Sequence, residues 1–275
     1  MSSIFGIIAT PFGYVMRFIY EFVGSYGVSI VLFSLLVKIV TSPLQLKQKK
    51  SMMATQKLQP KIQAIQKKYY NNKEKMNEEM TALYEREGVS PTAGCGTMLV
   101  TLLIIMGLYY VISQPLSYFF QLDGEQIKAL SEALGFELGK ANGAQIKLAG
   151  LIADNWEAVK GISDKLMPVD FRFLGIDLAV DPSLKRFGID WIIPVLSAAT
   201  AFGQSMLSMK MQEKKSGTTT AQSNKMMFYL MPLMSLYFGF ILPCGLGLYW
   251  ICNNIFGALA EIIFSKILDK ESVTK

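Results

Sequence analysis

Hydrophobic residues gather along the chain in five long runs, each close to the length that crosses a lipid bilayer. A bilayer core needs roughly 20 apolar residues in a helix, and the runs lie at 24–44, 91–115, 191–209, 226–243 and 244–264. The first run reaches this length only with Lys38 included, because the uncharged part from Gly24 to Val37 has 14 residues. The pattern predicts an all-α fold, a polytopic membrane helix bundle of five spans, in which one span carries a lysine.

Residues 1–23 are also apolar, but Pro11, Arg17 and Glu21 interrupt them. They lack the basic start and the small-residue cleavage site of a secretory signal. An amphipathic helix in the membrane interface is therefore favoured over an additional span.

Residues 45–90 have the pattern of a helical hairpin. Apolar residues recur at helical spacing in two sets, Leu58, Ile62, Ile65 and Tyr69, then Met76, Met80 and Leu83. Asn71 and Asn72 favour a turn between the two arms, and Pro60 predicts a kink in the first. Two interpretations stay open, a self-packed solvated pair and a cationic platform for a partner, which would use Lys57, Lys61, Lys67 and Lys68.

The charges of the connecting segments predict how the chain is oriented. Between residues 45 and 90 there are ten Lys and Arg against five acidic residues, and between 210 and 225 there are four against one. Between residues 116 and 190 the balance reverses, with eight basic against eleven acidic residues. Because excess Lys and Arg marks cytoplasmic segments, we expect 45–90, 210–225 and the tail 265–275 in the cytoplasm, and 116–190 and the N-terminus outside.

Composition narrows the function further. The 275 residues are 51% hydrophobic and 17% charged, with a net charge of +6, and they include no histidine. Triads that need histidine and imidazole metal sites are therefore excluded. The sequence has no phosphate-binding loop of the G-x-x-x-x-G-K-[ST] kind and no G-x-G-x-x-G, so nothing argues for nucleotide hydrolysis. We predict no catalytic residues, no metal and no cofactor.

Three of the predicted spans carry polar stripes. These are Ser34, Lys38 and Thr41 in the first, Ser197, Thr200, Gln204 and Ser208 in the third, and Trp250, Asn253 and Asn254, with Gly257, in the fifth. Steps of three and four residues place each set on one helix face. Such faces avoid lipid either by hydrogen bonding between helices or by lining a cavity that water reaches.

Lys38 allows two interpretations of its own. Its side chain can snorkel toward the cytoplasmic end of the span, since Gln45 is about 10 Å away along a helix. Alternatively it lines a hydrated pocket open to the cytoplasm. A buried lysine without a carboxylate partner is costly, and the sequence shows no acid in the middle of a span. The hydrated pocket is therefore favoured.

A series of motifs lies in order on these spans and beside them. It consists of KIVTSPL at 38–44, LQPK at 58–61 and QKKY at 66–69, PTAGC at 91–95 and LYY at 108–110, FLGIDL at 173–178 before Ile193 and Pro194, and LPCGL at 242–246 with LYW at 248–250 before Asn253 and Asn254. The series resembles the YidC/Oxa/Alb family of membrane protein insertases over residues 20–264, apart from an outer insertion at 122–169. The large outer domain of Gram-negative members has no counterpart, so the chain resembles the Gram-positive type.

The resemblance implies a hydrophilic groove that opens to the cytoplasm and to lipid and is closed toward the outside. Lys38 falls where the family usually has the arginine of this groove, and Gln204 and Trp250 match other positions that line it. Lysine keeps the positive charge but loses the planar fork of arginine. We expect the remaining polar residues of the three stripes to line the same groove and contact clients, namely Ser34, Thr41, Thr200, Ser208, Asn253 and Asn254.

The implied function is a membrane insertase and chaperone in a bacterial cell membrane that inserts and folds client proteins without nucleotide hydrolysis. Expected partners are nascent membrane proteins, lipids and the ribosome, with a Sec translocon as a further candidate; nucleic-acid sequence recognition and a small-molecule substrate are not expected. A secondary transporter or channel with a polar midplane site is the alternative, although an odd number of spans and the absence of a repeat disfavour it. A chaperone that packs clients without inserting them is another.

Overall fold

The computed structural model describes residues 4–89, 93–139, 143–182, 187–216 and 222–273, and this part of the chain is mostly helical. Five long helices fall on the five apolar runs: α2 (Tyr26–Lys57), α5 (Ala93–Ser113), α10 (Ile192–Ser216), α11 (Gln222–Ile241) and α12 (Cys244–Val273). The two-residue strands β1 (Arg172–Phe173) and β2 (Ile176–Asp177) form an antiparallel pair, the only sheet in these ranges. The predicted all-α fold is confirmed.

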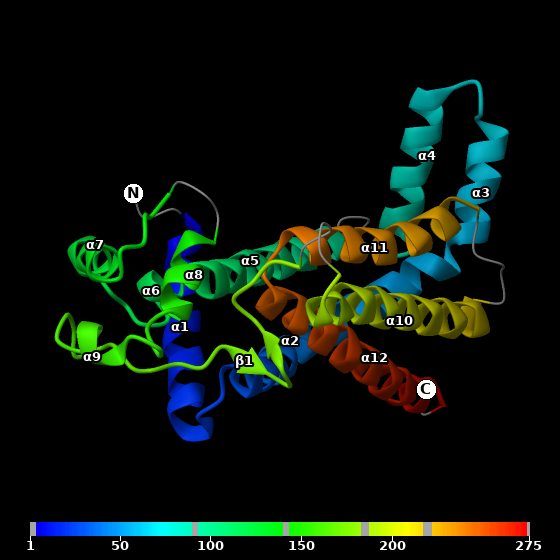
Figure 1. Cartoon of the computed structure of the whole chain (residues 1–275). Helices are drawn as coiled ribbons and strands as arrows, with labels where there is room; N and C mark the ends of the chain where they lie inside the picture. Colours follow the sequence, from blue (N-terminus) through cyan, green and yellow to red (C-terminus); the bar gives the residue numbers. More distant parts are fainter. Residues whose placement is uncertain (1–3, 90–92, 140–142, 183–186, 217–221, 274–275) are drawn as a thin grey trace.

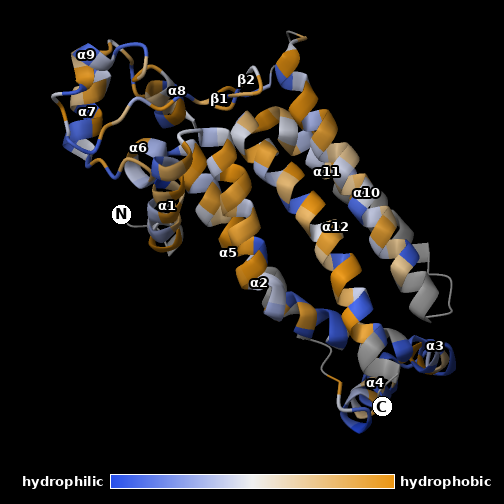
Figure 2. Cartoon of the chain, turned by 90° about the horizontal axis from the view of Figure 1, so that it is seen from below, coloured by the Kyte–Doolittle hydropathy of each residue, from blue (hydrophilic) through white to orange (hydrophobic). Residues whose placement is uncertain are grey.

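The helices also have the length and hydropathy of membrane helices. Within the described residues, three stretches are long and apolar enough to cross a bilayer, Tyr26–Thr55, Ile189–Met211 and Cys244–Asp269; two shorter apolar stretches are Leu99–Ser113 and Pro232–Ile241. Hydrophobic residues run along these helices (Figure 2), and many of them are exposed, among them Leu36, Val195 and Ile263. Contiguous apolar surface of this extent is unusual on a monomeric soluble protein, which agrees with the predicted membrane helix bundle.

Successive long helices point in opposite directions (Figure 1). Their packing follows the order α5, α2, α12, α10, α11, so that α12 lies between α2 and α10. One end of the bundle holds the residues that directly follow α2, together with the end of α10 and the C-terminus (Figure 1). The 116–190 segment lies at the other end. The helix that carries the fifth apolar run therefore contacts both other helices that carry polar stripes.

The sharp turn between α11 and α12 follows from Pro243, which has no N–H to continue a helix. The first N–H groups of α12 find acceptors in the preceding segment instead: Cys244 N donates to Val180 O (2.9 Å) and Gly245 N to Leu178 O (3.0 Å). These bonds satisfy groups that a helix start leaves without intrahelical partners. They also fix the start of α12 against the 116–190 segment.

Helix α2 continues well past the predicted end of the first span at residue 44. It runs through Pro43 to Lys57, and the hydroxyls of Thr41 and Ser42 donate to Val37 O (2.8 Å) and Lys38 O (2.7 Å) in the preceding turn. Neighbouring Ser and Thr side chains are one reason why proline is tolerated in membrane helices. The helix breaks only at Leu58, and Pro60 lies in the first turn of the next helix rather than inside an arm.

Helix α1 (Ile4–Val23) crosses the long helices instead of running beside them, as Figures 1 and 2 both show. Its buried residues include Ala9, Met16 and Tyr20, and its exposed ones Ile7, Tyr14, Phe18 and Phe22. Gly13 allows close packing, since a Cβ there would lie 1.9 Å from the carbonyl oxygen of Tyr118 in α6 (Pro115–Tyr118). A helix across the bundle with an exposed apolar face agrees with an interfacial location, which stays a prediction.

The predicted hairpin is present as α3 (Gln59–Lys68) and α4 (Lys73–Arg86), which project from the bundle (Figure 1). Its small core contains Leu58, Ile62 and Leu83, with Ile65 and Met80 packed against them, as the helical spacing predicted. Asn72 lies in the turn, where its side chain accepts a hydrogen bond from Lys75 N (3.0 Å) and caps α4.

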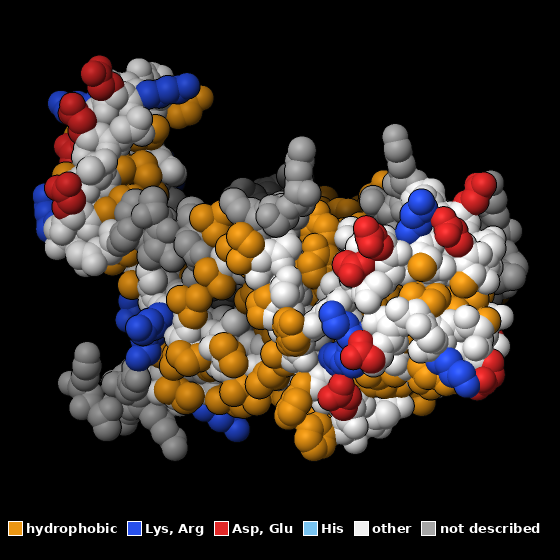
Figure 3. Space-filling model, turned by 90° about the vertical axis from the view of Figure 1, so that its left-hand side faces the viewer, with side chains coloured by type: hydrophobic (Ala, Val, Ile, Leu, Met, Phe, Trp, Pro, Cys, Tyr) orange, Lys and Arg blue, Asp and Glu red, His pale blue; other side chains and the backbone are white. Residues whose placement is uncertain are grey.

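The 116–190 segment forms a cap whose core is continuous with that of the long helices. Its short elements are α6, α7 (Gly124–Ala133), α8 (Ala144–Gly150), α9 (Trp156–Val159), the β1–β2 pair and the 3₁₀ helix η1 (Ile189–Trp191). Asp123 and Gln126 form a capping box at the start of α7. Arg17 of α1 donates to Lys165 O (3.1 Å), which ties α1 to this cap. In the view onto this end, charged side chains lie over the cap and over the projecting hairpin, and hydrophobic ones gather between them (Figure 3).

Candidate functional site

The inward face of α2 carries the lysine of the first apolar run. Ile39 and Val40 are 60% and 69% exposed and face away from the bundle, whereas Ser34 is buried and Lys38 is partly buried. The hydroxyl of Ser34 donates to Ile30 O (2.6 Å), and Thr41 Oγ1 accepts a hydrogen bond from Gln45 Nε2 (2.9 Å). Both hydroxyls are thus satisfied within α2.

The contact between α10 and α12 is held by polar side chains. Asn254 Nδ2 lies 3.1 Å from Thr200 Oγ1 and 3.3 Å from Ser197 O, so one amide of α12 donates to a hydroxyl and a carbonyl of α10. Ser197 Oγ in turn lies 2.7 Å from Ser235 Oγ of α11. The interhelical hydrogen bonding that the sequence left open as one interpretation is therefore present for Ser197, Thr200 and Asn254.

Gln204 lies one turn further along α10 and packs directly on a glycine of α12. A Cβ at Gly257 would lie 2.3 Å from Gln204 Nε2, so the side chain of Gln204 occupies the space that the glycine leaves. Trp250 is partly buried against Phe238 of α11, with ring centroids 6.0 Å apart. Asn253 and Ser208 are partly buried on α12 and α10.

An ion pair that the sequence reasoning missed joins α2 to α12. Lys49 Nζ contacts Glu261 Oε1, and the two side chains are only 12% and 20% exposed. The carboxylate of Glu261 also acts electrostatically on the ammonium group of Lys38. The sequence shows no acid in the middle of a span, and Glu261 lies only three residues before the end of the fifth apolar run, where its pairing with a lysine of α2 was not predicted.

The helical spacing of the polar residues along α2 and α12 is the sequence signal from which this ion pair could have been predicted. Glu261 continues the α12 stripe four residues after Gly257, and Lys49 continues the α2 stripe through Gln45. Lys49 lies beyond the first apolar run, which ends at residue 44, whereas Glu261 lies just inside the end of the fifth. Helix α2 continues to Lys57, and this extension brings Lys49 beside Glu261 of α12.

Together these residues form what we call the polar seam: Lys38, Thr41 and Lys49 of α2, Thr200 and Gln204 of α10, and Asn253, Asn254 and Glu261 of α12. The seam follows both contacts of α12, with hydrogen bonds on the α10 side and charges on the α2 side. Ser34 lies deeper in the bundle. The structure thus brings most of the predicted groove residues to one central helix and its two neighbours.

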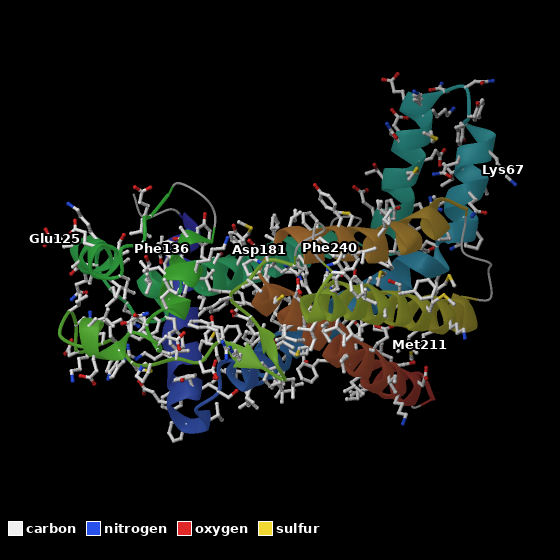
Figure 4. All side chains as sticks on the ribbon, viewed as in Figure 1. Lys67, Glu125, Phe136, Asp181, Met211 and Phe240 are labelled. Atoms are coloured by element: carbon white, nitrogen blue, oxygen red, sulfur yellow. The ribbon has the colours of Figure 1, made fainter. Side chains whose placement is uncertain are left out.

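The predicted platform lysines lie apart from the seam. Lys57 ends α2, and Lys61 of α3 pairs with Glu87, which follows α4. Lys68 Nζ lies 5.0 Å from the ring centroid of Tyr69. Lys67 points outward from α3 and lies at the opposite end of the molecule from Glu125 of the acidic cap (Figure 4).

Comparison with known proteins agrees with this arrangement. Residues 18–271 match the model of the 60Kd inner membrane protein family. The chain is 27% identical over 266 residues to the membrane protein insertase YidC of Fusobacterium nucleatum, covering 97% of this chain and 98% of that protein. It is 31% identical over 252 residues to YidC of Nitratidesulfovibrio vulgaris and 30% identical over 249 residues to the inner membrane protein ALBINO3 of Arabidopsis thaliana.

The last two alignments cover 91% and 88% of this chain, but the chain spans only 37% and 47% of the length of those relatives. A match over residues 18–271 includes every long helix and the hairpin. The chain therefore belongs to the 60Kd inner membrane protein family. This is the YidC/Oxa/Alb family, which its motifs resemble.

Proposed function

We propose that this protein is a membrane protein insertase and chaperone in which the polar seam receives the polar flank of a client while its apolar span moves into lipid. One observation carries the proposal: polar stripes on three helices meet around α12 inside a bundle whose outer surface is apolar. The names of the relatives, membrane protein insertases in two bacteria, support the same reading.

The proposed topology has five spans, with the N-terminus outside and the C-terminus in the cytoplasm. Two observations support it: successive long helices run in opposite directions, and the segments at the two ends of the bundle differ in charge. The hairpin carries the excess of Lys, whereas the cap of residues 116–190 is acidic. Excess Lys and Arg on one side is the usual mark of a cytoplasmic segment. Helix α1 then lies in the interface on the outer side of the cell membrane.

Energetics explain why such an activity needs no nucleotide. A client span of about 20 apolar residues gains roughly 0.3 to 0.6 kcal/mol for each residue on insertion, on the order of 6 to 12 kcal/mol in total. The barrier is the polar flank that must cross the hydrocarbon. In the proposed mechanism, water enters a groove beside the seam and shortens that crossing.

Within this groove, Lys38 attracts an acidic flank, while Gln204, Asn253 and Ser208 offer hydrogen bonds to it. The membrane potential favours outward movement of negative charge by about 2.3 kcal/mol per charge at 100 mV. Lys57 at the end of α2 and the hairpin lysines Lys61, Lys67 and Lys68 face the cytoplasm. They offer a cationic surface to a ribosome, to a Sec translocon or to anionic lipid headgroups.

Reconstitution tests this proposal. Purified protein in liposomes should insert a single-span client with an acidic tail, measured as protection of the tail from external protease, whereas empty liposomes should not. A chaperone that only packs clients would bind the client without protecting its tail. A channel or transporter would instead pass solutes, which the same vesicles report as flux of an entrapped dye. Binding or flux without insertion contradicts the proposal.

A further inference from the structure

Glu261 is the acidic residue of the polar seam, and it pairs with a lysine of the neighbouring helix α2. It lies on α12, one turn beyond Gly257, with its side chain 20% exposed and its carboxylate in contact with Lys49 Nζ. Lys49 Nζ also lies 3.4 Å from the backbone oxygen of Glu261. Lys49 is thus held against α12 by two contacts, while the charge of Glu261 also reaches Lys38.

Stability alone does not require an ion pair at this place. Buried ion pairs contribute little net stability relative to well-packed apolar residues, because both charges lose their water. The described ion pairs of the hairpin and the cap are more exposed than this one, with Lys61 59% exposed and Lys147 50% exposed. The pair of Lys49 and Glu261 instead lies between two helices of the seam. Its charges therefore act where the client flank is proposed to pass.

We propose that Glu261 is a built-in counterion that competes with acidic client residues for the two lysines of α2. This inference rests on the proposed function and adds a residue that determines specificity. In the resting protein Glu261 partly neutralises Lys49 and Lys38. An acidic residue of the client exchanges with this carboxylate, and Glu261 returns to the lysines when the client leaves. The lysines therefore need not stay unpaired in the bundle.

The competition also limits how tightly an acidic flank is held. A client must displace Glu261 before it pairs fully with Lys49, which weakens binding and speeds release. Glu261 thereby sets the preference of the seam for acidic over neutral flanks. The three charges sum to +1 in the native protein, since two lysines face one glutamate.

Single substitutions shift this sum in opposite directions. Glu261→Gln keeps the shape of the side chain and raises the sum to +2, so the seam should hold acidic flanks more tightly. Lys49→Gln lowers the sum to 0 and leaves Glu261 facing Lys38, so the preference for acidic flanks should fall. The double variant restores +1. A purely structural role would give another result, because losing either partner would impair all clients alike.

The test uses the full chain and two peptides with the same apolar span, one with an Asp and one with an Asn in the flank. A photoreactive residue next to that position crosslinks the peptide to the purified protein in detergent, and the Asp-to-Asn ratio of crosslinking is the readout. When water screens it as in bulk solvent, one unit charge about 4 Å away changes binding on the order of three- to tenfold. Glu125→Gln is the matched control, because it removes the same charge from α7 at the other end of the molecule.

We expect the Asp-to-Asn ratio to rise about three- to tenfold in Glu261→Gln, to fall by a similar factor in Lys49→Gln, and to return near the native value in the double variant. Glu125→Gln should leave the ratio unchanged. Single variants that both move the ratio in the same direction, or that leave it within twofold of the native value, overturn the inference. If one single variant fails to fold, the other and the double variant still decide the sign.

The same proteins in liposomes separate this inference from the proposed function. If the native protein inserts clients but the ratio ignores both substitutions, the counterion role is wrong and the insertase function stands. If the ratio responds as expected but no client becomes protected, the counterion acts in binding and the insertase function is wrong.

Discussion

Asn253 and Asn254 are neighbours on α12, but their side chains differ in whether they form hydrogen bonds to α10. Asn254 donates to Thr200 Oγ1 and Ser197 O on α10, while among the described residues no hydrogen bond of the Asn253 side chain is found. We therefore predict that Asn254→Ala loosens the packing of α10 on α12, whereas Asn253→Ala leaves it intact. Thr200 keeps a partner in the variant, because its own hydroxyl donates to Leu196 O (2.8 Å).

The size of the effect follows from the two lost bonds. Hydrogen bonds between membrane helices average about 0.6 kcal/mol each and reach roughly 1.7. The 3.3 Å bond to Ser197 O is long, so we expect a total loss of about 1 kcal/mol. For a protein of this size such a loss lowers the unfolding midpoint by roughly 2–4 °C.

Thermal unfolding of the purified protein in detergent measures this midpoint. A double-mutant cycle with Thr200→Val isolates the bond between Asn254 and Thr200, and we expect a coupling free energy of about 0.5 kcal/mol. Asn253→Ala serves as the control at the adjacent position. A coupling near zero, or an equal loss of stability in Asn253→Ala, would refute the assignment.

Two further predictions concern client insertion. Gly257→Leu should impair insertion while the protein still reaches the membrane, because its Cβ would lie 2.3 Å from Gln204 Nε2 and must push that side chain away; Gly203→Leu on α10, where a Cβ meets nothing within 4 Å, should have little effect. Replacing residues 59–86 by a short Gly-Ser linker should reduce insertion, because it removes the proposed cationic platform, while the protein still integrates into the membrane. The ion pair of Lys61 and Glu87 shows that the two ends of the hairpin lie close together, so a short linker can join them. Unchanged client yield in either the Gly257 variant or the deletion would argue against that prediction.

The sequence predicts the elements of this fold well, because hydropathy and helical spacing are local properties. The five apolar runs became α2, α5, α10, α11 and α12, and the hairpin core formed from the spaced residues around Ile62 and Leu83. Helix ends were harder to predict. Pro43 looked like the end of the first span, but α2 continues to Lys57 with the hydroxyls of Thr41 and Ser42 bonding the preceding turn.

Relations between helices depend on register and rotation, which a single sequence does not contain. The pairing of Lys49 with Glu261 joins residues 212 positions apart and requires that α2 and α12 lie side by side. The choice of Asn254 over Asn253 as the partner of α10 depends on the rotation of α12 by a single residue. The sequence therefore predicted three polar stripes but not which side chains bond across them.

The central claim is that a positive charge in the seam acts on the client flank, and substitution of Lys38 tests it most directly. The initial rate of insertion of an acidic-tailed, single-span client into liposomes would be measured for the native protein, Lys38→Arg and Lys38→Ala. Lys38→Arg keeps the charge and should insert at close to the native rate. Lys38→Ala should be slower by about fivefold or more, the effect of one nearby unit charge. Insertion by Lys38→Ala at the native rate would contradict the account.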